Sequence, residues 1–315
     1  MQADKILILG ANGQIGTVLT AELRKKYGRD NVLATDIREA VEQTGPFVQL
    51  DVLDVYKMEK LIVEHGITQI YHLAAILSAT GEQFPQKTWH VNVDAYLSML
   101  EMVKSHPIKR IFFPSSIAVF GKTTPRAHTP QDVPLLPETV YGISKTTGEN
   151  WSNYYHAKYS MDIRSIRYPG IIGWQSIPAG GTTDYAVEIY HAALRDGHYT
   201  CFLKADTRLP MMYMPDAIRA TIELMEAPGE QLTVRAGYNL AGMSFTPAEI
   251  TQSIQKYLPE FTISYEPDFR QDIAASWTES IDDSRARDDW HWKPEFDLDK
   301  MTRDMISHIT PMYAS

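Results

Sequence analysis

The sequence predicts an α/β fold, a doubly wound parallel sheet with a smaller C-terminal α/β lobe. Three observations lead to this prediction. Apolar runs rich in Val, Ile and Phe alternate with segments of helical period, which is typical of parallel strands joined by crossover helices. A glycine-rich turn follows the first apolar run and opens the first helical segment. The 315 residues are 44% hydrophobic, so the chain can bury a sizeable core.

Eight apolar runs are expected to form strands, because each is short and bounded by turn residues or by a helical segment. They are KILIL (5–9), NVLATD (31–36), FVQLDV (47–52), QIYHLAA (69–75), RIFFPSS (110–116), IRSIRYPGII (163–172), PMMYM (210–214) and RAGYNLAG (235–242).

The expected helices lie between these runs. Apolar residues recur at helical intervals after Gly16, and Gly28 ends that helix. Further helices are expected to begin near Asp54 and Gln86. Short helices dominate beyond about residue 244, and one of them opens with the capping-box segment TPAE.

No linker rich in Pro, Gly or Ser divides the chain. We expect residues 1–173, with returning segments near 205–242, to form an NAD-binding domain of the Rossmann type. Residues 174–204 and 243–315 are expected to form a substrate-binding lobe folded against the sheet. The tail of that lobe contains three tryptophans, Trp277, Trp290 and Trp292.

Composition excludes several classes of function. The net charge is −9 and no basic stretch is present, which argues against a nucleic-acid partner. The single cysteine, Cys201, cannot form an intrachain disulfide, and the ten histidines show no metal-ligand spacing. The first apolar run is too short for a targeting or membrane segment. We therefore expect a cytoplasmic protein in a reducing compartment, without a structural metal or a membrane partner.

The turn GANGQIG carries the strongest signal for a cofactor. Its glycines, Gly10, Gly13 and Gly16, allow a tight turn, a close backbone approach to a pyrophosphate and close packing of the next helix. The pattern is GxxGxxG rather than the commoner GxGxxG. We expect the turn to bind a dinucleotide, with further contacts from Asn12, Gln14 and Ile15.

An acidic residue at the end of the second strand indicates which dinucleotide. Asp36 lies twenty residues after Gly16, where a carboxylate can accept both ribose hydroxyls. The same charge repels a 2′-phosphate, so NAD is favoured over NADP, with Ile37 also expected at the cofactor. Arg38 weakens that preference.

Two further strand ends are expected to meet the cofactor. Asp51 and Val52 end the third strand and can contact the adenine edge, although Asp51 serves equally well as a helix cap. Leu73, Ala74 and Ala75 end the fourth strand and present small side chains along the cofactor path.

The segment VYGISKTTGE places Tyr141 four residues before Lys145. Spacing alone does not identify a catalytic pair, because Tyr56/Lys60 and Tyr154/Lys158 have the same interval. Only the first pair follows serines at a strand end, and Tyr141 lies 25 residues beyond the second of them.

A serine at a strand end, a tyrosine and a lysine one helical turn later resemble the catalytic set of the extended short-chain dehydrogenase/reductases. A tyrosine base removes the hydroxyl proton of an alcohol, but its ordinary pKa is about 10. An adjacent ammonium, here Lys145, is expected to lower the pKa of Tyr141 by about one to three units. Lys145 also holds the nicotinamide ribose in this interpretation. Ser116 would bind the substrate oxygen, with Ser115 as the alternative.

A resemblance over longer segments narrows the choice of substrate. RYPGIIG, the block from 178 to 228 and MSFTPAEI are similar to the L-threonine 3-dehydrogenases of the short-chain type. The resemblance implies oxidation of L-threonine at its 3-hydroxyl to 2-amino-3-oxobutyrate, reduction of NAD and a homodimer. Two alternatives stay open, a nucleotide-sugar epimerase or dehydratase and a non-catalytic NAD-sensing protein.

The loop before the helical segment DYAVEIYHAAL suits a small zwitterion. Gly180 and Gly181 can expose backbone N–H groups, and Thr182 or Thr183 can cap the helix, so that its N-terminus binds a carboxylate. Ordinary capping without a ligand is the alternative.

Other residues are expected around the same pocket. Ser78 and Thr80 follow the fourth strand and can contact the substrate, or they are plain loop hydroxyls. Tyr168, Pro169 and Ile171 are expected to line the nicotinamide pocket and exclude water. Trp277 either closes the pocket or packs in the lobe.

The helical segments around 90–105 and 144–159 carry more large apolar residues than two covering helices usually need. A dimer interface is the functional interpretation and burial within one subunit is the alternative. The residues concerned are Val91, Tyr96, Leu97, Leu100, Trp151, Tyr154 and Tyr155.

Overall fold

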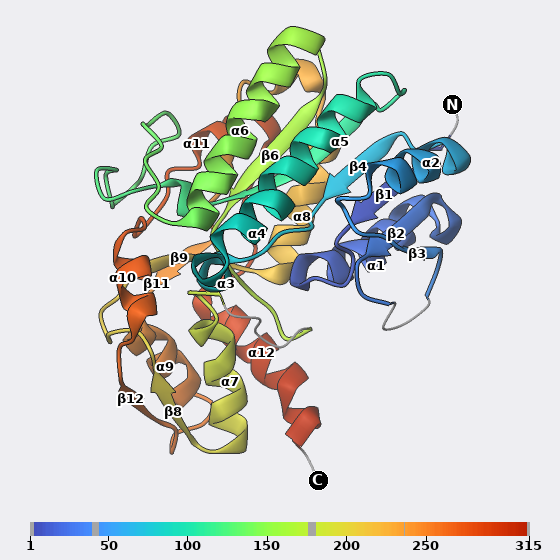
Figure 1. Ribbon diagram of the computed structural model, residues 1–315. Helices are drawn as coiled ribbons and strands as arrows, with labels where there is room; N and C mark the ends of the chain where they lie inside the picture. The colour runs from blue at the N-terminus through green and yellow to red at the C-terminus, as the bar shows by residue number, and fades with distance from the viewer. Residues whose placement is uncertain (1–2, 40–43, 176–180, 236, 314–315) are drawn as a thin grey trace.

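A seven-stranded parallel sheet forms the centre of the computed structural model, which describes residues 3–39, 44–175, 181–235 and 237–313 (Figure 1). The strand order is β10-β6-β5-β4-β1-β2-β3, and every pairing is parallel. The predicted doubly wound sheet is confirmed. Its strands are β1 (Ile6–Leu9), β2 (Val32–Asp36), β3 (Phe47–Gln49), β4 (Gln69–His72), β5 (Arg110–Ser116), β6 (Ile163–Tyr168) and β10 (Tyr238–Asn239).

Helices cover both faces of this sheet. One face packs against α2 (Val55–His65), α5 (Ala95–Val103) and α6 (Val140–Tyr159), which lie in front of the sheet in Figure 1. The other face packs against α1 (Gln14–Tyr27) and α8 (Met214–Glu226). The central strands β1 and β2 are buried on both sides, which explains why they are continuous apolar runs rather than alternating ones.

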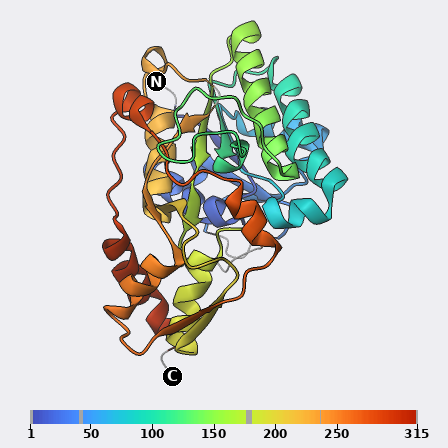
Figure 2. The same cartoon turned by 90° about the vertical axis from the view of Figure 1, so that its left-hand side faces the viewer.

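The smaller lobe lies beneath the main sheet in Figure 2. A three-stranded sheet in the order β11-β9-β7 and a parallel pair, β12-β8, belong to this part. Their bounds are β7 (Gly170–Ile172), β8 (His198–Cys201), β9 (Leu209–Tyr213), β11 (Met243–Phe245) and β12 (Thr262–Tyr265). The other helices are α3 (Ser78–Gln83), α4 (Pro85–Trp89), α7 (Tyr185–Arg195), α9 (Pro247–Gln255), α10 (Phe269–Ala275), α11 (Ser284–Trp290) and α12 (Leu298–Tyr313).

Two expectations about this half of the chain are wrong. The run at 163–172 is divided at Pro169 into β6 and β7, which pair in different sheets, because proline has no N–H with which to continue the ladder. Trp290 and Trp292 pack in the core between the main sheet and α8, not in the lobe, whereas Trp277 does pack in the lobe core. The division of the chain into domains stays a prediction.

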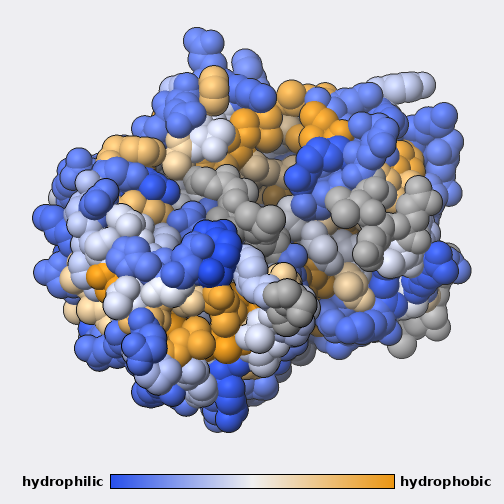
Figure 3. Space-filling model, turned by 90° about the horizontal axis from the view of Figure 1, so that it is seen from below, coloured by the Kyte–Doolittle hydropathy of each residue, from blue (hydrophilic) through white to orange (hydrophobic). Residues whose placement is uncertain are grey.

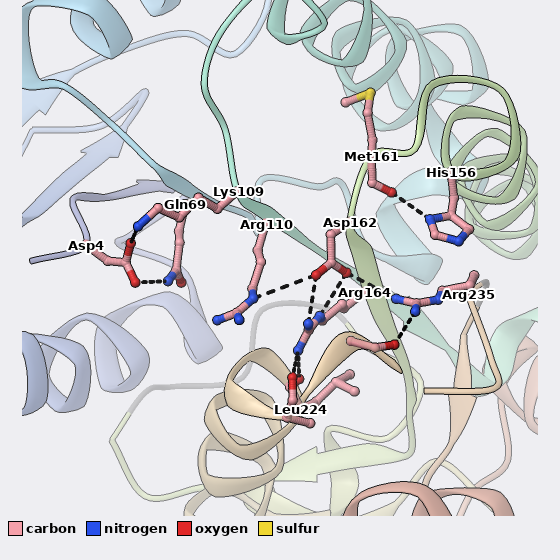
Figure 4. A network of polar contacts seen from close by, with 12 residues as sticks. Asp4, Gln69, Lys109, Arg110, His156, Met161, Asp162, Arg164, Leu224 and Arg235 are labelled. Atoms are coloured by element: carbon pink, nitrogen blue, oxygen red, sulfur yellow. Dashed lines mark hydrogen bonds and ion pairs between the residues drawn. The ribbon is translucent and has the colours of Figure 1, made fainter. Parts of the chain in front are cut away.

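A network of charged side chains joins β6 to the end of α8 at the amino-terminal edge of the sheet (Figure 4). The buried guanidinium of Arg164 binds the carboxylate of Asp162 at 2.7 Å and donates to the backbone oxygens of Leu224 and Ala227. Arg235 also donates to Asp162, at 3.2 Å. These hydrogen bonds give donors to backbone carbonyls at the end of α8, which have no donor within the helix itself.

The surface seen from below Figure 1 is mostly hydrophilic, with hydrophobic patches and a hollow between the lobe and the larger sheet (Figure 3). Within the described ranges, no helix is long and apolar enough to cross a membrane.

The close packing of α6 on β5 yields a first prediction. A Cβ at Gly148 would lie 2.2 Å from Cζ of Phe113, and that buried ring is stacked on Tyr96 at 4.4 Å. We expect Gly148→Ala to lower the free energy of unfolding by about 1–3 kcal/mol, because the ring cannot move aside without strain. Urea unfolding measures the change.

Gly81→Ala is the matched control, because Gly81 also lies in a helix but a Cβ there would be 3.5 Å from its nearest neighbour, the Thr88 side chain. Alanine favours a helix more than glycine does, so this variant should be as stable as the wild type or slightly more stable. Equal losses of stability in both variants would contradict the packing argument.

Candidate active site

Two neighbouring cavities lie at the carboxyl ends of the strands, around the point where the strand order reverses between β1 and β4. Open α/β sheets bind ligands at this position. One cavity, of about 420 Å³, is lined by the glycine turn and the ends of β2 and β4, and we call it the dinucleotide cavity. The other, of about 150 Å³, contains Tyr141, and we call it the Tyr141 cavity. Leu73 and Ala75 line both cavities.

The glycine turn has the shape that a pyrophosphate site needs. Gly10 has a φ of +88°, and a Cβ there would lie 2.7 Å from the backbone nitrogen of Ala74. A Cβ on Gly16 would lie 2.2 Å from the oxygen of Gly10, so α1 can start this close to β1 only with glycine. Gly13 precedes α1 and leaves its N-terminus without a side-chain cap. The first N–H groups of α1 can therefore receive an anion.

Asp36 is buried at the end of β2 and lines the dinucleotide cavity. Its carboxylate accepts from the backbone N–H of Asn12 at 2.9 Å and of Arg38 at 3.0 Å, so its orientation is set by the protein. The Arg38 guanidinium lies on the exposed side of the carboxylate, at 3.2 Å. These residues fit the adenosine ribose of a dinucleotide.

Most of the residues expected to bind the cofactor line one of the two cavities. The dinucleotide cavity includes Gly10, Gly13, Asp36, Ile37, Asp51, Val52, Leu73, Ala74 and Ala75. The Tyr141 cavity includes Gln14, Ile15, Tyr168, Pro169 and Ile171, and the Gln14 amide donates to the oxygen of Ile171 at 3.3 Å. Asn12 and Gly16 belong to the glycine turn but line neither cavity.

Two expectations need correction here. Asp51 does not cap α2, because Asp54 does so by accepting from the Lys57 N–H, while Asp51 accepts from Leu53 two residues on. Thr80 lines the dinucleotide cavity rather than the Tyr141 cavity, because α3 begins at Ser78 and turns it toward the cofactor side.

The end of β5 and the first turns of α6 bring the three catalytic candidates together. Ser116 and Tyr141 both line the Tyr141 cavity, and the Ser116 hydroxyl is close enough to the phenol to act on its pKa. The ammonium of Lys145 is buried, donates to the oxygen of Pro114 at 2.8 Å and lies 5.4 Å from the centre of the Tyr141 ring. Ser115 also lines the cavity, but its hydroxyl donates to the Glu149 carboxylate at 2.5 Å. The structure thus brings Ser116, and not Ser115, to the phenol.

The electrostatics of the ligand-free site differ from the expectation. Burial raises the pKa of Tyr141 to about 12, although the hydrogen bond with Ser116 acts in the opposite direction. Burial also lowers the pKa of Lys145 to about 7. The expected lowering of the Tyr141 pKa by Lys145 is absent here, because both groups are removed from water and the ammonium is itself only partly populated at neutral pH.

Hydroxyl groups form part of the wall of the Tyr141 cavity. Ser78 and Thr182 lie 3.3 Å apart between their hydroxyl oxygens, and Thr183 lines the cavity beside them. The expectation that Thr182 or Thr183 caps the next helix is wrong, because α7 begins at Tyr185 and Asp184 occupies the capping position.

The backbone groups of this loop also differ from the expectation. The Gly181 N–H donates to the Asp184 carboxylate at 2.7 Å, so it is not exposed for a ligand, because the tight turn brings the two residues together. Gly180 lies outside the described residues. Asp184 and Trp277 both line the cavity. Sequence reasoning missed Asp184, although its place directly after two threonines in a polar loop was a usable signal.

The other two tyrosine–lysine pairs lie on helix surfaces. Tyr56 is 81% exposed on α2. Tyr154 is 43% exposed on α6, and Lys158 donates to its hydroxyl at 2.7 Å in solvent. Among the residues that the structure describes, no three His, Cys, Asp or Glu side chains form a group that can hold a metal ion.

Comparison with known proteins identifies the family. The model of the NAD dependent epimerase/dehydratase family matches residues 6–241. Mitochondrial L-threonine 3-dehydrogenase from Bos taurus is 45% identical over 308 residues, which are 96% of this chain and 82% of the bovine protein.

Two solved structures are similar over nearly their whole length. A GalE-like L-threonine dehydrogenase from Cupriavidus necator in its holo form is 53% identical, with a TM-score of 0.95 and coverage of 97% of this chain and 99% of that chain. A monomeric L-threonine 3-dehydrogenase from a metagenome, in its apo form, is 47% identical, with a TM-score of 0.96 and coverage of 98% and 100%. The chain therefore belongs to the NAD dependent epimerase/dehydratase family.

Proposed function

We propose that this protein oxidises L-threonine at its 3-hydroxyl to 2-amino-3-oxobutyrate with reduction of NAD. The observation that carries the proposal is the set of Ser116, Tyr141 and Lys145 on the wall of a small cavity next to a dinucleotide cavity. The relatives named as L-threonine dehydrogenases support the choice of substrate.

NAD would be held by the glycine turn and by Asp36, whose carboxylate suits the two hydroxyls of an unphosphorylated ribose. When bound, NAD supplies the hydride acceptor. The dinucleotide cavity also contains Ala74 and Ala75, whose small side chains leave room along the sheet edge. Tyr168, Pro169 and Ile171 give the Tyr141 cavity an apolar wall that excludes water from the reacting centre.

Tyr141 acts as the base in this proposal. It accepts the proton of the 3-hydroxyl onto its phenolate oxygen while Ser116 holds the same hydroxyl by a hydrogen bond. Because burial raises the pKa of Tyr141 to about 12 in the free protein, few molecules carry the phenolate at neutral pH. The rate should therefore rise with pH. Lys145, one turn further along α6, is placed to orient the cofactor ribose and to favour the phenolate when it is protonated.

The Tyr141 cavity suits the charges of a free amino acid. Its lining contains one acidic residue, Asp184, and the hydroxyls of Ser78, Thr182 and Thr183 within the described residues. The substrate ammonium would meet the Asp184 carboxylate, and the hydroxyls would bind the substrate carboxylate. These roles rest on the lining positions of the four side chains.

The two alternatives fit the cavity less well. A nucleoside diphosphate sugar carries two phosphate groups, and the described residues that line the Tyr141 cavity include no arginine to bind them. A non-catalytic NAD sensor has no need of a desolvated tyrosine and lysine beside a serine. Neither alternative is favoured by a specific feature of the site.

We also propose a homodimer formed through α5 and α6. Tyr96, Leu100 and Tyr155 are buried within the subunit and are not available for it. The support comes from Tyr154 and Tyr159, which are 43% and 39% exposed and belong to an aromatic cluster with Trp151. The remaining expected residues, Val91 and Leu97, are partly buried. One relative is named as monomeric, so oligomeric state must be measured.

A cytoplasmic location is a further proposal. Cys201 is buried and free, which suits a reducing compartment. The bovine relative is named as mitochondrial, so fractionation of source cells is the appropriate test.

The central test is the reduction of NAD by L-threonine, followed by absorbance, with L-serine and nucleotide sugars as competing substrates. We expect Tyr141→Phe to abolish turnover because it removes the base, while NAD binding measured by calorimetry stays near the wild-type value. Tyr154→Phe is the control, since Tyr154 has the same spacing to a lysine but lies on the exposed surface of α6. Wild-type turnover in Tyr141→Phe would disprove the assignment of the base.

The buried Lys145 yields a prediction about stability. Burial lowers its pKa to about 7 from 10.5, so below pH 7 the folded protein bears the full cost of a buried ammonium. That cost shrinks as pH rises from 7 toward 10.5, because the folded state releases the proton first. Lys145→Met should therefore raise the Tm of the ligand-free protein at about pH 6 and lose this advantage by about pH 10. A gain in Tm that grows with pH would contradict the lowered pKa of Lys145.

The dimer is tested by light scattering after gel filtration. We expect the wild type to have twice the mass of one chain and Tyr154→Arg to be a monomer, because a charge would be buried in the interface. Tyr56→Arg introduces the same charge on α2, at an 81% exposed tyrosine, and should remain dimeric. A monomeric wild type would end the proposal.

A further inference from the structure

We propose that the buried ion pair between Glu149 and Arg167 is a positioning device that directs Ser116, rather than Ser115, onto the phenol of Tyr141. The inference rests on the proposed function, because it concerns how that active site is aligned. Neither residue lines the Tyr141 cavity, so the pair would act only through Ser115 and the end of β5.

Three contacts attach α6 to the last residues of β5. Tyr141, Lys145 and Glu149 are spaced one turn apart, so they occupy one face of α6. Lys145 donates to the oxygen of Pro114 at 2.8 Å, and Ser115 donates to Glu149 at 2.5 Å. The following residue of β5, Ser116, lines the same cavity as Tyr141 and lies close enough to the phenol to lower its pKa. Consecutive residues of the strand are thus each held by a different residue of the helix.

Glu149 determines which serine is free to meet the phenol. A serine hydroxyl has one proton to donate. Ser115 gives that proton to the carboxylate of Glu149, a residue only 1% exposed, in the short geometry typical of charge-assisted hydrogen bonds. The rotamer of Ser115 is then fixed toward α6. Without this acceptor, the end of β5 loses one of the contacts that hold it against α6, and Ser116 loses its fixed position opposite Tyr141.

Arg167 holds the carboxylate in place from β6. Its guanidinium donates to Glu149 at 3.0 and 2.8 Å, to the backbone oxygen of Gln131 at 2.9 Å and to the Asn239 side chain at 3.0 Å. The pair is therefore fixed by β6, β10 and the loop before α6. Buried ion pairs stabilise proteins little, if at all, relative to apolar residues of the same volume. Stability alone does not account for this arrangement, whereas orientation of Ser115 does.

Two variants test the role. Glu149→Gln keeps the shape but weakens the acceptor and leaves the Arg167 charge uncompensated, and Ser115→Ala removes only the hydroxyl that Glu149 holds. We expect Glu149→Gln to lower kcat by about 10-fold or more through misalignment. A smaller fall in kcat is expected for Ser115→Ala, and Ser115→Thr should restore most of it. In Glu149→Gln and Ser115→Ala, KM for L-threonine and Kd for NAD should stay near wild-type values.

The dependence of kcat on pH distinguishes a loss of positioning from a general loss of folded protein. Loss of the Ser116 contact removes an interaction that favours the phenolate, so the rising limb of kcat should move to higher pH in Glu149→Gln. The charged groups that line the cavity with Tyr141 are Lys145 and Asp184 among the described residues, and both remain in the variant. A variant that is only less stable would contain less active enzyme, but its kcat would rise over the same pH range as that of the wild type.

Asp162→Asn is the matched control. Asp162 is the carboxylate partner of Arg164 (Figure 4). Arg164 is also buried and lies on β6 as Arg167 does, but nearer the start of the strand. This variant should lose thermal stability but keep the kcat and the pH profile of the wild type. Unchanged kcat and pH limb in both Glu149→Gln and Ser115→Ala would overturn the inference, as would equal kinetic losses in Asp162→Asn. A wild-type enzyme that does not reduce NAD with L-threonine would instead refute the proposed function.

Discussion

The site depends on how closely α6 approaches β5. A glycine at position 148 lets the helix lie against the ring of Phe113, where any Cβ would overlap the ring. At this separation Lys145 can reach the oxygen of Pro114 and Tyr141 can reach Ser116. Gly142 has the same role nearer the start of the helix, since a Cβ there would lie 2.1 Å from the oxygen of Ala118. The arrangement of the proposed catalytic residues is therefore a consequence of backbone packing.

That packing also sets the electrostatics. The same approach that aligns Tyr141 and Lys145 removes both from water, so burial moves their pKa values in opposite directions, to about 12 and about 7. In each case the neutral form is favoured. A desolvated pair of this kind responds strongly to any charge brought next to it, because little solvent is present to screen that charge.

Charged residues on β6 have two separate tasks. Arg164, at the amino-terminal edge, satisfies carbonyls at the end of α8, while Arg167, near the carboxyl-terminal edge, compensates Glu149 behind the active site. Both are buried, and both are paired with a carboxylate. One strand therefore connects the scaffold to the site, with Asp184 and the hydroxyl groups of the lobe completing the other wall of the cavity.

Local signals were sufficient for the parallel sheet and for the placement of the glycine turn, Asp36 and Tyr141 at its carboxyl-terminal end, because each depends on residues close together in the chain or on the end of a buried strand. The positions of several other side chains depend on contacts between segments that are far apart in the chain. Only the folded chain showed that Ser115 is committed to Glu149, that Thr80 faces the dinucleotide cavity and that Trp290 and Trp292 pack on the main sheet. Sequence spacing carries no information on which of two adjacent hydroxyls meets a partner 34 residues away; the partners that packing supplies settle it.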